Sequence, residues 1–525
     1  MRALLFWSLL LLATAQAAAP WWDADIPADV PADSPAVPEP SGHLRGIWVD
    51  AYGEGFKTPA EIDTLIQNAQ ALNLNALFVQ VVRRGDCYCL RSSLPVSRDP
   101  ALAPGFDPLE ALIGRAHAAG LQVHAWVVTL ALWSGDAPPT DPAHVYNLHG
   151  PNAPEAENWL NVRYDGEMRP QEDVYLDPGV PAVADYLAEA VVSLVDNYNI
   201  DGVTFDRLRY PDFNDGSVPS WGYNPTSLAR FAEETGVDGL PHPTDETWTA
   251  WRREQLTLLM RRLYLGAKRA DPTVWVGAAT IAYGAPPEDF ADSHAYRVVL
   301  QDWAGWLGDG FLDLNLLMNY KRDADPEAAA WFEPWNRYAV TIQGGGATAV
   351  ATGMYLNDPE GTEAQAAAVV ANAALVGWVG YSYRTPSDAV AAGWSDPQSV
   401  RDELASSLTA PDTPFAAPVV FNRPPPVTAL LGRVEIDETQ GEATGGQTVE
   451  LLTTGDVVAT AVTDPTGRYG FVVGEGGDYL LRLHGGVAVP APIRTGRVVP
   501  APTLTRTWVA VESDAPDDHA GSLDP

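Results

Sequence analysis

The sequence predicts an α/β protein in which a (β/α)₈ TIM barrel is followed by a small all-β sandwich domain. Three observations lead to this prediction. Between residues 43 and 410, eight short apolar runs alternate with segments that carry apolar residues at helical spacing. A Pro-rich linker at 411–426 ends this pattern, and residues 427–511 hold only short strand-like runs separated by turn signals. Alternation implies parallel strands joined by helical crossovers, and eight such units close a barrel.

The barrel elements follow one another in a regular order. The predicted strands cover 44–50, 76–82, 121–128, 201–206, 273–280, 311–319, a seventh at either 338–342 or 349–355 (the latter preferred), and 377–383. The predicted helices cover 59–72, 108–119, 181–198, 225–270 with a break near 236–243, 296–307, 326–335, 361–376 and 397–408. A long loop spans 129–178, and loops of this length inside a domain are usually functional. An open doubly wound sheet is the competing arrangement, but no glycine-rich phosphate turn follows the first strand.

The two ends of the chain differ from its middle. Residues 1–19 have the features of a signal peptide, with Arg2 before an apolar run and Ala15-Gln-Ala as a cleavage site. Residues 20–42 form a Pro- and Ala-rich lead, and residues 512–525 form an acidic tail that we expect to be disordered. No later segment is a transmembrane candidate. We therefore expect export to the periplasm, the cell envelope or the medium.

Composition limits the partners. Lys and Arg total 32 against 68 Asp and Glu, a formal net charge of −36, so nucleic acid and anionic membrane surfaces are not expected partners. The 18 Trp and 19 Tyr suit the stacking of rings on sugars, although most aromatic residues in a barrel belong to its core. The two cysteines, Cys87 and Cys89, either pair with each other or remain free thiols. We predict no cofactor and no metal, and protein partners stay unknown.

Strand direction separates the acidic residues into two groups. TIM barrels place their sites at the C-terminal ends of the strands, whereas the N-terminal ends serve stability. Asp206 leaves strand four and is predicted to be catalytic, while Asp201 enters that strand and is predicted to be structural. By the same rule Asp313 enters strand six and is structural, whereas Asn319 and Tyr320 leave it and face the site.

Other polar and aromatic residues lie in or directly after the first four strands. We predict that they bind substrate: Trp48, Asp50, Arg84, Asp86, Tyr88, His124, Trp126, Arg207 and Tyr210. Aromatic rings, Arg and Asn side chains and carboxylates gathered at one rim fit a sugar site, in which rings stack, polar groups bind hydroxyls and acids transfer protons.

Two regions resemble known families. The chain over about 43–410 resembles the family-10 glycosyl hydrolase-like proteins, which are exported bacterial barrels. The matching motifs are Leu44-Arg-Gly-Ile-Trp, Phe78-Val-Gln-Val-Val-Arg-Arg-Gly-Asp-Cys-Tyr, Gly120-Leu-Gln-Val-His-Ala-Trp, Tyr175-Leu-Asp-Pro-Gly, Asp201-Gly-Val-Thr-Phe-Asp-Arg-Leu-Arg-Tyr-Pro and Gln301-Asp-Trp-Ala-Gly-Trp-Leu. In the second region, Thr463-Asp-Pro-Thr-Gly-Arg-Tyr-Gly-Phe resembles the carboxypeptidase regulatory-like module, a small β-sandwich.

The first resemblance implies hydrolysis of glycosidic bonds and, for some members, cleavage of peptidoglycan glycan strands that lack stem peptides. Many relatives carry Asp-Asp-Tyr where this chain has Asp206-Arg207-Leu208, so a second acid must come from elsewhere. Glycoside hydrolysis usually needs two carboxyl groups. We rank Asp302, which begins the helix after strand five, above Glu288 in the same loop, and both below Asp206.

These observations favour a glycosidase, an O-glycosyl hydrolase that acts on a cell-envelope polysaccharide. The alternative is a non-catalytic polysaccharide-binding protein with a degenerate barrel. Deacetylation of the same class of substrate is a weaker option, because such chemistry generally uses a metal cluster and no Asp/His ligand grouping is apparent.

Overall fold

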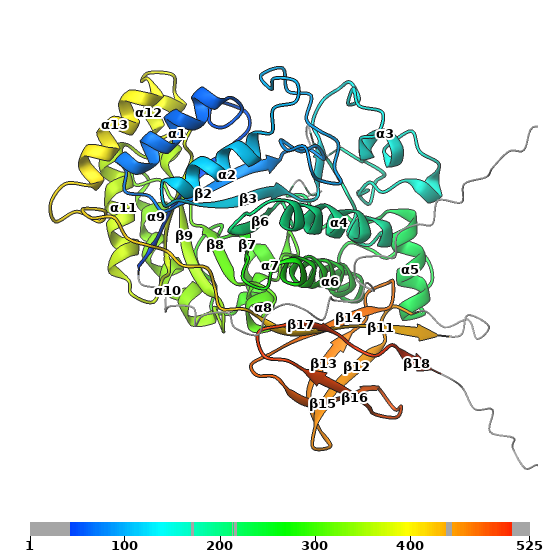
Figure 1. The fold of residues 1–525 in the computed structure, drawn as a ribbon. Coiled ribbons are helices and arrows are strands. Elements are labelled where there is room, and N and C mark those ends of the chain that lie inside the picture. The colour runs from blue at the N-terminus through cyan, green and yellow to red at the C-terminus, as the bar shows by residue number, and fades with distance from the viewer. Residues whose placement is uncertain (1–41, 170–172, 213, 215–217, 437–443, 507–525) are drawn as a thin grey trace, which may run out of the picture.

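The computed structural model describes residues 42–169, 173–212, 214, 218–436 and 444–506, so the predicted signal peptide, nearly all of the lead and the acidic tail lie outside the described residues. Eight parallel strands form a closed barrel in the order β1-β10-β9-β8-β7-β6-β3-β2 (Figure 1). The strands are β1 Leu44–Val49, β2 Ala76–Val82, β3 Gln122–Val128, β6 Gly202–Asp206, β7 Trp275–Ile281, β8 Leu314–Met318, β9 Ala347–Gly353 and β10 Gly377–Tyr381. The predicted TIM barrel is confirmed.

Helices cover the outside of the barrel (Figure 1). The main ones are α1 Pro59–Ala71, α2 Pro108–Ala118, α4 Pro181–Asn197, α5 Pro225–Thr235, α6 Glu246–Ala270, α8 Trp303–Gly308, α10 Phe332–Ile342, α11 Pro359–Ala371 and α13 Pro397–Leu408. Their starts are encoded locally. Thr58, Asp107 and Asp396 cap α1, α2 and α13 with their side chains, and a proline follows each of them.

Four expected elements differ in the structure. The single helix predicted at 326–335 is α9 Pro326–Ala330 followed by the start of α10. The helix predicted at 296–307 is two short helices, α7 His294–Arg297 and α8, because Leu300 between them has a left-handed backbone with φ 57°. Residues 338–342, one of the two positions considered for strand seven, belong to α10. The preferred position, 349–355, overlaps β9, which is the seventh strand. The long loop at 129–178 holds β4 Ala131–Trp133, paired with β5 Val174–Tyr175, and the short helix α3 Val145–His149.

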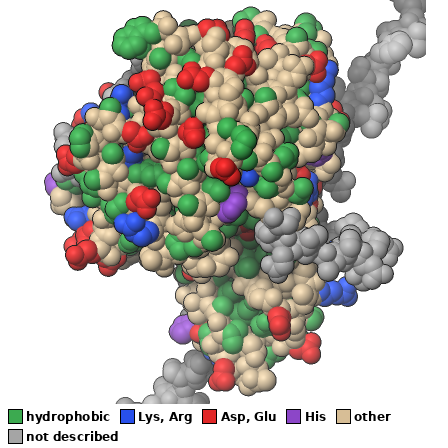
Figure 2. All heavy atoms as spheres, turned by 90° about the vertical axis from the view of Figure 1, so that its left-hand side faces the viewer, with side chains coloured by type: hydrophobic (Ala, Val, Ile, Leu, Met, Phe, Trp, Pro, Cys, Tyr) green, Lys and Arg blue, Asp and Glu red, His purple; other side chains and the backbone are tan. Residues whose placement is uncertain are grey.

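The C-terminal region forms two small sheets that pack face to face. One joins β14 Arg468–Val473, β11 Thr428–Ile436, β17 Val498–Pro500 and β18 Leu504–Arg506, and the other joins β13 Asp456–Val462, β12 Thr448–Thr453, β15 Gly477–Leu483 and β16 Val489–Ile493. Leu430, Val449 and Leu481 lie in the core between them. Figure 2 shows this region as the smaller body beneath the barrel. The predicted sandwich is confirmed, whereas its resemblance to the carboxypeptidase regulatory-like module stays a prediction.

The sandwich and the linker are both fixed to the barrel. Arg262 of α6 is almost fully buried at the interface, where it binds Asp464 of the sandwich at 3.2 Å and Asp185 of α4. The linker passes under the N-terminal ends of the strands, and its Arg423 binds Asp201 at 3.0 Å and Asp271 at 2.7 Å. Within the part of the chain that the structure describes, no helix is long and apolar enough to cross a membrane.

Candidate active site

A cavity of about 220 Å³ opens at the C-terminal end of the barrel, and we call it the mouth cavity. It is lined by Trp48, Trp126, Asp206, Arg207, Arg209, Ala279, Tyr283, Met318, Tyr320, Tyr355 and Tyr381. These residues come from seven of the eight barrel strands or from the segments that follow them. The site therefore lies where the strand-end rule places it.

Asp206 is the last residue of β6 and is held by donors on two sides. Its Oδ2 accepts a hydrogen bond from Trp126 Nε1 at 3.2 Å, and its Oδ1 accepts one from the backbone N–H of Arg207 at 2.7 Å. Arg209 Nη1 lies 3.7 Å from Oδ1. The backbone is fixed as well, because the N–H and the hydroxyl of Thr129 both donate to the Asp206 carbonyl at 2.8 Å. The carboxylate is thus oriented before any substrate binds.

The two arginines after Asp206 take different positions. Arg207 has a left-handed backbone with φ 54°, which turns the chain away from the strand, and its Nη1 donates to the hydroxyl of Tyr175 at 3.0 Å. The side chain of Arg209 is 5% exposed, and its Nε lies 3.7 Å from Asp212 Oδ2. Arg209 therefore stands between two carboxylates, those of Asp206 and Asp212, and gives this side of the mouth cavity a buried positive charge.

Aromatic rings form the rest of the wall. Trp48 meets Trp126 edge to face with ring centroids 4.8 Å apart, and Tyr320 stacks on Tyr381 with centroids 5.5 Å apart. Trp48 is 2% exposed, and its Nε1 has no hydrogen-bond partner among the described residues. A cavity with ring faces, buried N–H donors and one well-oriented carboxylate can stack a sugar ring, bind its oxygens and exchange a proton with it.

The structure brings together only some of the residues predicted from the sequence. Trp48, Trp126, Asp206, Arg207 and Tyr320 line the mouth cavity. Three further predicted residues follow the first two strands but do not line it. They are Asp50, which binds Arg384 Nε with both oxygens at 2.9 Å; Arg84, which pairs with Asp173 at 3.1 Å; and Asp86. Burial raises the pKa of Tyr186, and the charge of Asp86 adds to that effect.

Four predicted residues are packed away from the mouth cavity. His124 is fully buried inside the barrel, where it stacks on Phe78, and burial lowers its pKa to about 4. Tyr88 is fully buried and donates to Asp99 at 2.9 Å. Asn319 is fully buried and donates to the carbonyl of Phe332 at 2.9 Å. Tyr210 is buried with its hydroxyl unpartnered among the described residues, close to Asp177 and Arg252.

The two predicted partner acids also lie outside the lining of the mouth cavity. Asp302 is the N-cap of α8, and its Oδ1 accepts the backbone N–H of Gly305 at 3.0 Å. Burial raises its pKa, against the opposing effect of that hydrogen bond. Glu288 is exposed in the loop after β7. Their catalytic roles stay predictions.

Sequence reasoning missed Tyr283, Tyr355 and Tyr381 as cavity residues. Tyr381 ends β10, Tyr355 follows β9 and Tyr283 follows β7. The strand-end rule would have found all three if it had been applied to strands five, seven and eight. Arg209 carried a weaker signal, because only the fold of its loop turns its side chain back towards Asp206.

Asp177, next to Tyr210, allows a test of the buried polar cluster by pH. Burial raises its pKa to about 6, against hydrogen bonds from Gly179 and Ser227. Because the folded pKa exceeds the unfolded value, this group's contribution to stability is full below about pH 4 and falls as pH rises through about 6. We expect Asp177→Asn to raise the free energy of unfolding at pH 7 by on the order of 2 kcal/mol, with no gain at pH 4. Urea unfolding at both pH values measures this, and an equal effect at both would contradict it.

Cys87 and Cys89 form a disulfide in the loop after β2, with Cα atoms 5.1 Å apart, so the paired alternative holds. Both residues are buried. Among the residues that the structure describes, no three His, Cys, Asp or Glu side chains gather as metal ligands.

Comparison with known proteins adds to this geometry. A family model described as glycosyl hydrolase-like 10 matches residues 43–340. The glycosyl hydrolase DigH of Escherichia coli O6:H1 is 26% identical over 279 residues, covering 48% of this chain and 56% of that protein. The glycosyl hydrolase YngK of Bacillus subtilis (strain 168) is 24% identical over 262 residues, covering 47% and 46%. The chain thus spans about half the length of these curated relatives.

Solved structures with a similar fold include α-L-fucosidase isoenzyme 2 from Paenibacillus thiaminolyticus. It has a TM-score of 0.47 and 15% identity, with 71% of this chain and 49% of that chain covered. The glycoside hydrolase domain of PgaB (BpsB) from Bordetella bronchiseptica has a TM-score of 0.47 and 17% identity, with 69% and 99% covered.

Proposed function

Because the chain belongs to the glycosyl hydrolase-like 10 family, we propose that it is an exported glycoside hydrolase that cleaves a cell-envelope polysaccharide at the mouth of the barrel. The observation that carries the proposal is the position of Asp206, a carboxylate at a strand end, held by two hydrogen bonds and faced by aromatic rings. Both curated relatives are named glycosyl hydrolases, which supports the same reaction. The proposed substrate is the glycan strand of peptidoglycan without stem peptides.

The reaction needs a second carboxyl group in most glycosidases. Asp212 is the first candidate that we propose from the geometry, because Arg209 lies 3.7 Å from both Asp206 and Asp212. Asp302 and Glu288 remain the candidates from the sequence. One panel of variants, Asp212→Asn, Asp302→Asn and Glu288→Gln, separates the three, since only loss of the partner acid lowers kcat by about a hundredfold or more.

Purified protein tests the function on intact sacculi, on sacculi stripped of stem peptides and on a neutral glucan. We expect soluble fragments from the stripped sacculi. The second candidate is a non-catalytic polysaccharide-binding protein, favoured by Arg207 at the position where many relatives carry a second acid. Retention of the protein on stripped sacculi with no soluble product after long incubation would favour binding alone.

Trp126 provides a further test, because its indole N–H is one of the two hydrogen-bond donors to Asp206. Trp126→Phe keeps the ring and removes that donor. We expect kcat to fall about tenfold, since a hydrogen bond to a charged group contributes about 1.5–3 kcal/mol, while KM changes little. Steady-state kinetics on peptide-free strands measures both. Trp133→Phe is the matched control, because its indole donates to the Ala137 carbonyl away from the mouth cavity. A rise in KM with unchanged kcat would mean that Trp126 only binds substrate.

A further inference from the structure

The mouth cavity alone is small for a polysaccharide. Its volume of about 220 Å³ lies below the usual range of about 300–1,000 Å³ for ligand pockets. Two larger hollows open at the same end of the barrel, one of about 490 Å³ and one of about 770 Å³. The chemistry proposed for Asp206 accounts for neither of them.

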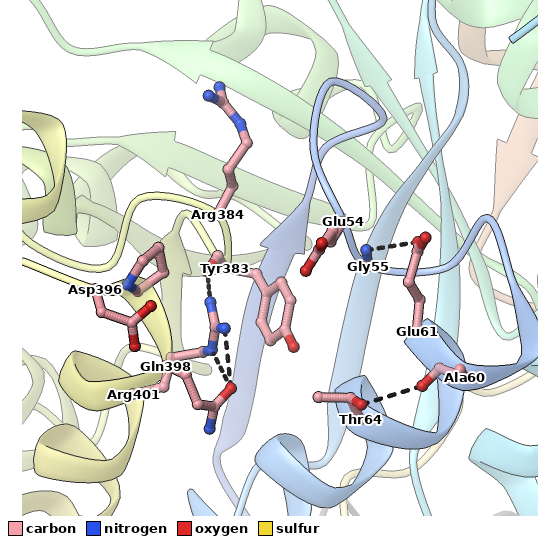
Figure 3. Close-up of a pocket in the computed structure, with 11 residues that line it drawn as sticks. Glu54, Gly55, Ala60, Glu61, Thr64, Tyr383, Arg384, Asp396, Gln398 and Arg401 are labelled. Atoms are coloured by element: carbon pink, nitrogen blue, oxygen red, sulfur yellow. Dashed lines mark hydrogen bonds between the residues drawn. The ribbon is translucent and has the colours of Figure 1, made fainter. Parts of the chain in front are cut away.

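The first hollow lies between α1 and α13, and Figure 3 shows how its walls are built. Glu54 comes from the loop after β1 and Glu61 from the first turn of α1, whereas Asp396 caps α13 and Arg401 lies in that helix. This hollow adjoins the mouth cavity at the end of β10, because Tyr381 lines the mouth cavity while Tyr383 and Arg384, two and three residues later, line the hollow.

A large exposed ring stands next to the first hollow. Trp394 is 84% exposed and lies two residues before Asp396, which lines the hollow. Tryptophan is mostly buried in folded proteins, and an indole in contact with water offers a flat face for the apolar side of a sugar.

The second hollow lies between the start of α6 and the segment around α7. Arg253 and Arg297 line it, together with His294. His294 also contacts Tyr283 of the mouth cavity, with ring centroids 5.1 Å apart, and its Nδ1 is buried without a hydrogen-bond partner among the described residues. The Tyr283–His294 pair is therefore the wall that the mouth cavity and the second hollow share.

The strand order places the two hollows on opposite sides of the mouth. The first hollow borders the segments after β1 and β10, which are neighbours in the barrel. The second borders the segment after β7, which lies four strands from β1 in the eight-stranded ring and therefore faces it. The three spaces thus form a path across the end of the barrel, with Asp206 at its middle.

We propose that a linear glycan strand lies along this path, with sugar units in both hollows, so that the protein cuts inside the strand and not at its ends. The proposal rests on the glycosidase function proposed above. It assigns substrate contacts to Trp394, which lies beside the first hollow, and to Arg297, which lines the second. A protein that removes single units from a chain end would have no use for open binding space on both sides of the cleavage point.

The test is strand binding as a function of length, measured by calorimetry with the Asp206→Asn protein and peptide-free peptidoglycan strands sorted by length. We expect affinity to rise at least tenfold from one disaccharide to strands of several disaccharides. Trp394→Ala and Arg297→Ala, each made in the Asp206→Asn background, should each lower the affinity for long strands about tenfold. Arg337→Ala is the matched control for Arg297→Ala, because Arg337 is about equally exposed, pairs with Glu333 and lines none of the three spaces. Val487→Ala is the control for the exposed Trp394, because Val487 is exposed in the sandwich.

The outcomes distinguish a failure of the proposed binding path from a failure of the proposed glycosidase function. Affinity that does not depend on strand length, or that both variants leave unchanged, overturns the path. Length-dependent binding, together with a wild-type protein that releases no product, keeps the path and rejects the glycosidase function. In the active wild-type protein, early products of many lengths support internal cutting, whereas single units released from the ends contradict it.

Discussion

Asp206→Asn is expected to lower kcat on peptide-free glycan strands by about a thousandfold, because it removes the carboxylate at the centre of the mouth cavity and general acid–base catalysis typically contributes a factor of about 10²–10⁴. The side-chain shape is kept, and Trp126 Nε1 can still donate to the amide oxygen. The fold should therefore be unaffected. Asp206 is the one acidic residue among the described residues that line the cavity, so no neighbour in that lining can replace it.

The control for this variant is the midpoint of urea unfolding, which should match that of the wild type. KM should also stay close to the wild-type value, since the aromatic walls remain. Activity within threefold of the wild type would mean that Asp206 is not a catalytic residue, and Asp212 would then be the first candidate.

Asp201→Asn should give the opposite result, a loss of stability with little loss of chemistry. Asp201 precedes the same strand, at the other end of the barrel, and its side chain is 10% exposed. Its oxygens bind His117 Nε2 and the backbone N–H of Val123 at 2.8 Å, and Arg423 Nε at 3.0 Å. Breaking a buried ion pair costs about 3–5 kcal/mol, and because Arg423 and His117 are partly exposed we expect about 3 kcal/mol.

The pH dependence of this loss has a definite sign. Although burial opposes it, hydrogen bonding from His117 and Val123 and the charge of Arg423 hold the pKa of Asp201 below its usual value. The stabilisation is therefore present above about pH 4 and is lost as pH falls through the folded pKa. Urea unfolding should show a large difference between wild type and Asp201→Asn at pH 7 and a small one at low pH. A variant with wild-type stability and no activity would overturn the assignment by strand direction.

The barrel was predictable because its signals are local and repeated. The apolar run that became β2, the capped and proline-started helices and the glycine after α5 each specify an element within a few residues. The helix expected at 296–307 was wrong because its apolar spacing continues across Leu300, whose left-handed backbone ends helical geometry there and leaves no mark in that spacing. The pairing of β4 with β5 joins residues about 40 positions apart, and no local pattern reports such a contact.

For the candidate site, strand direction predicted at which end of the barrel a residue lies, but not which residues line the cavity. Strand direction placed Asp206 and Tyr320 at the mouth cavity and Asp201 at the other end of the barrel, while the roles assigned to the two acids stay predictions. The rule failed to distinguish residues that follow a strand but turn away, such as Tyr210 and Asn319, because the course of a loop depends on tertiary contacts. His124 and Trp126 lie on the same face of β3, yet only Trp126 reaches the cavity, since depth along the barrel decides which side chain is covered.

The most direct measurement of the central claim is mass spectrometry of the products formed from peptide-free glycan strands by the wild type and by Asp206→Asn, side by side. We predict wild-type products that each carry one added water and a new reducing end, and no such products from Asp206→Asn at the same protein concentration. Products with an anhydro end, or hydrolytic products that form equally fast with Asp206→Asn, would contradict hydrolysis by Asp206 at the mouth of the barrel.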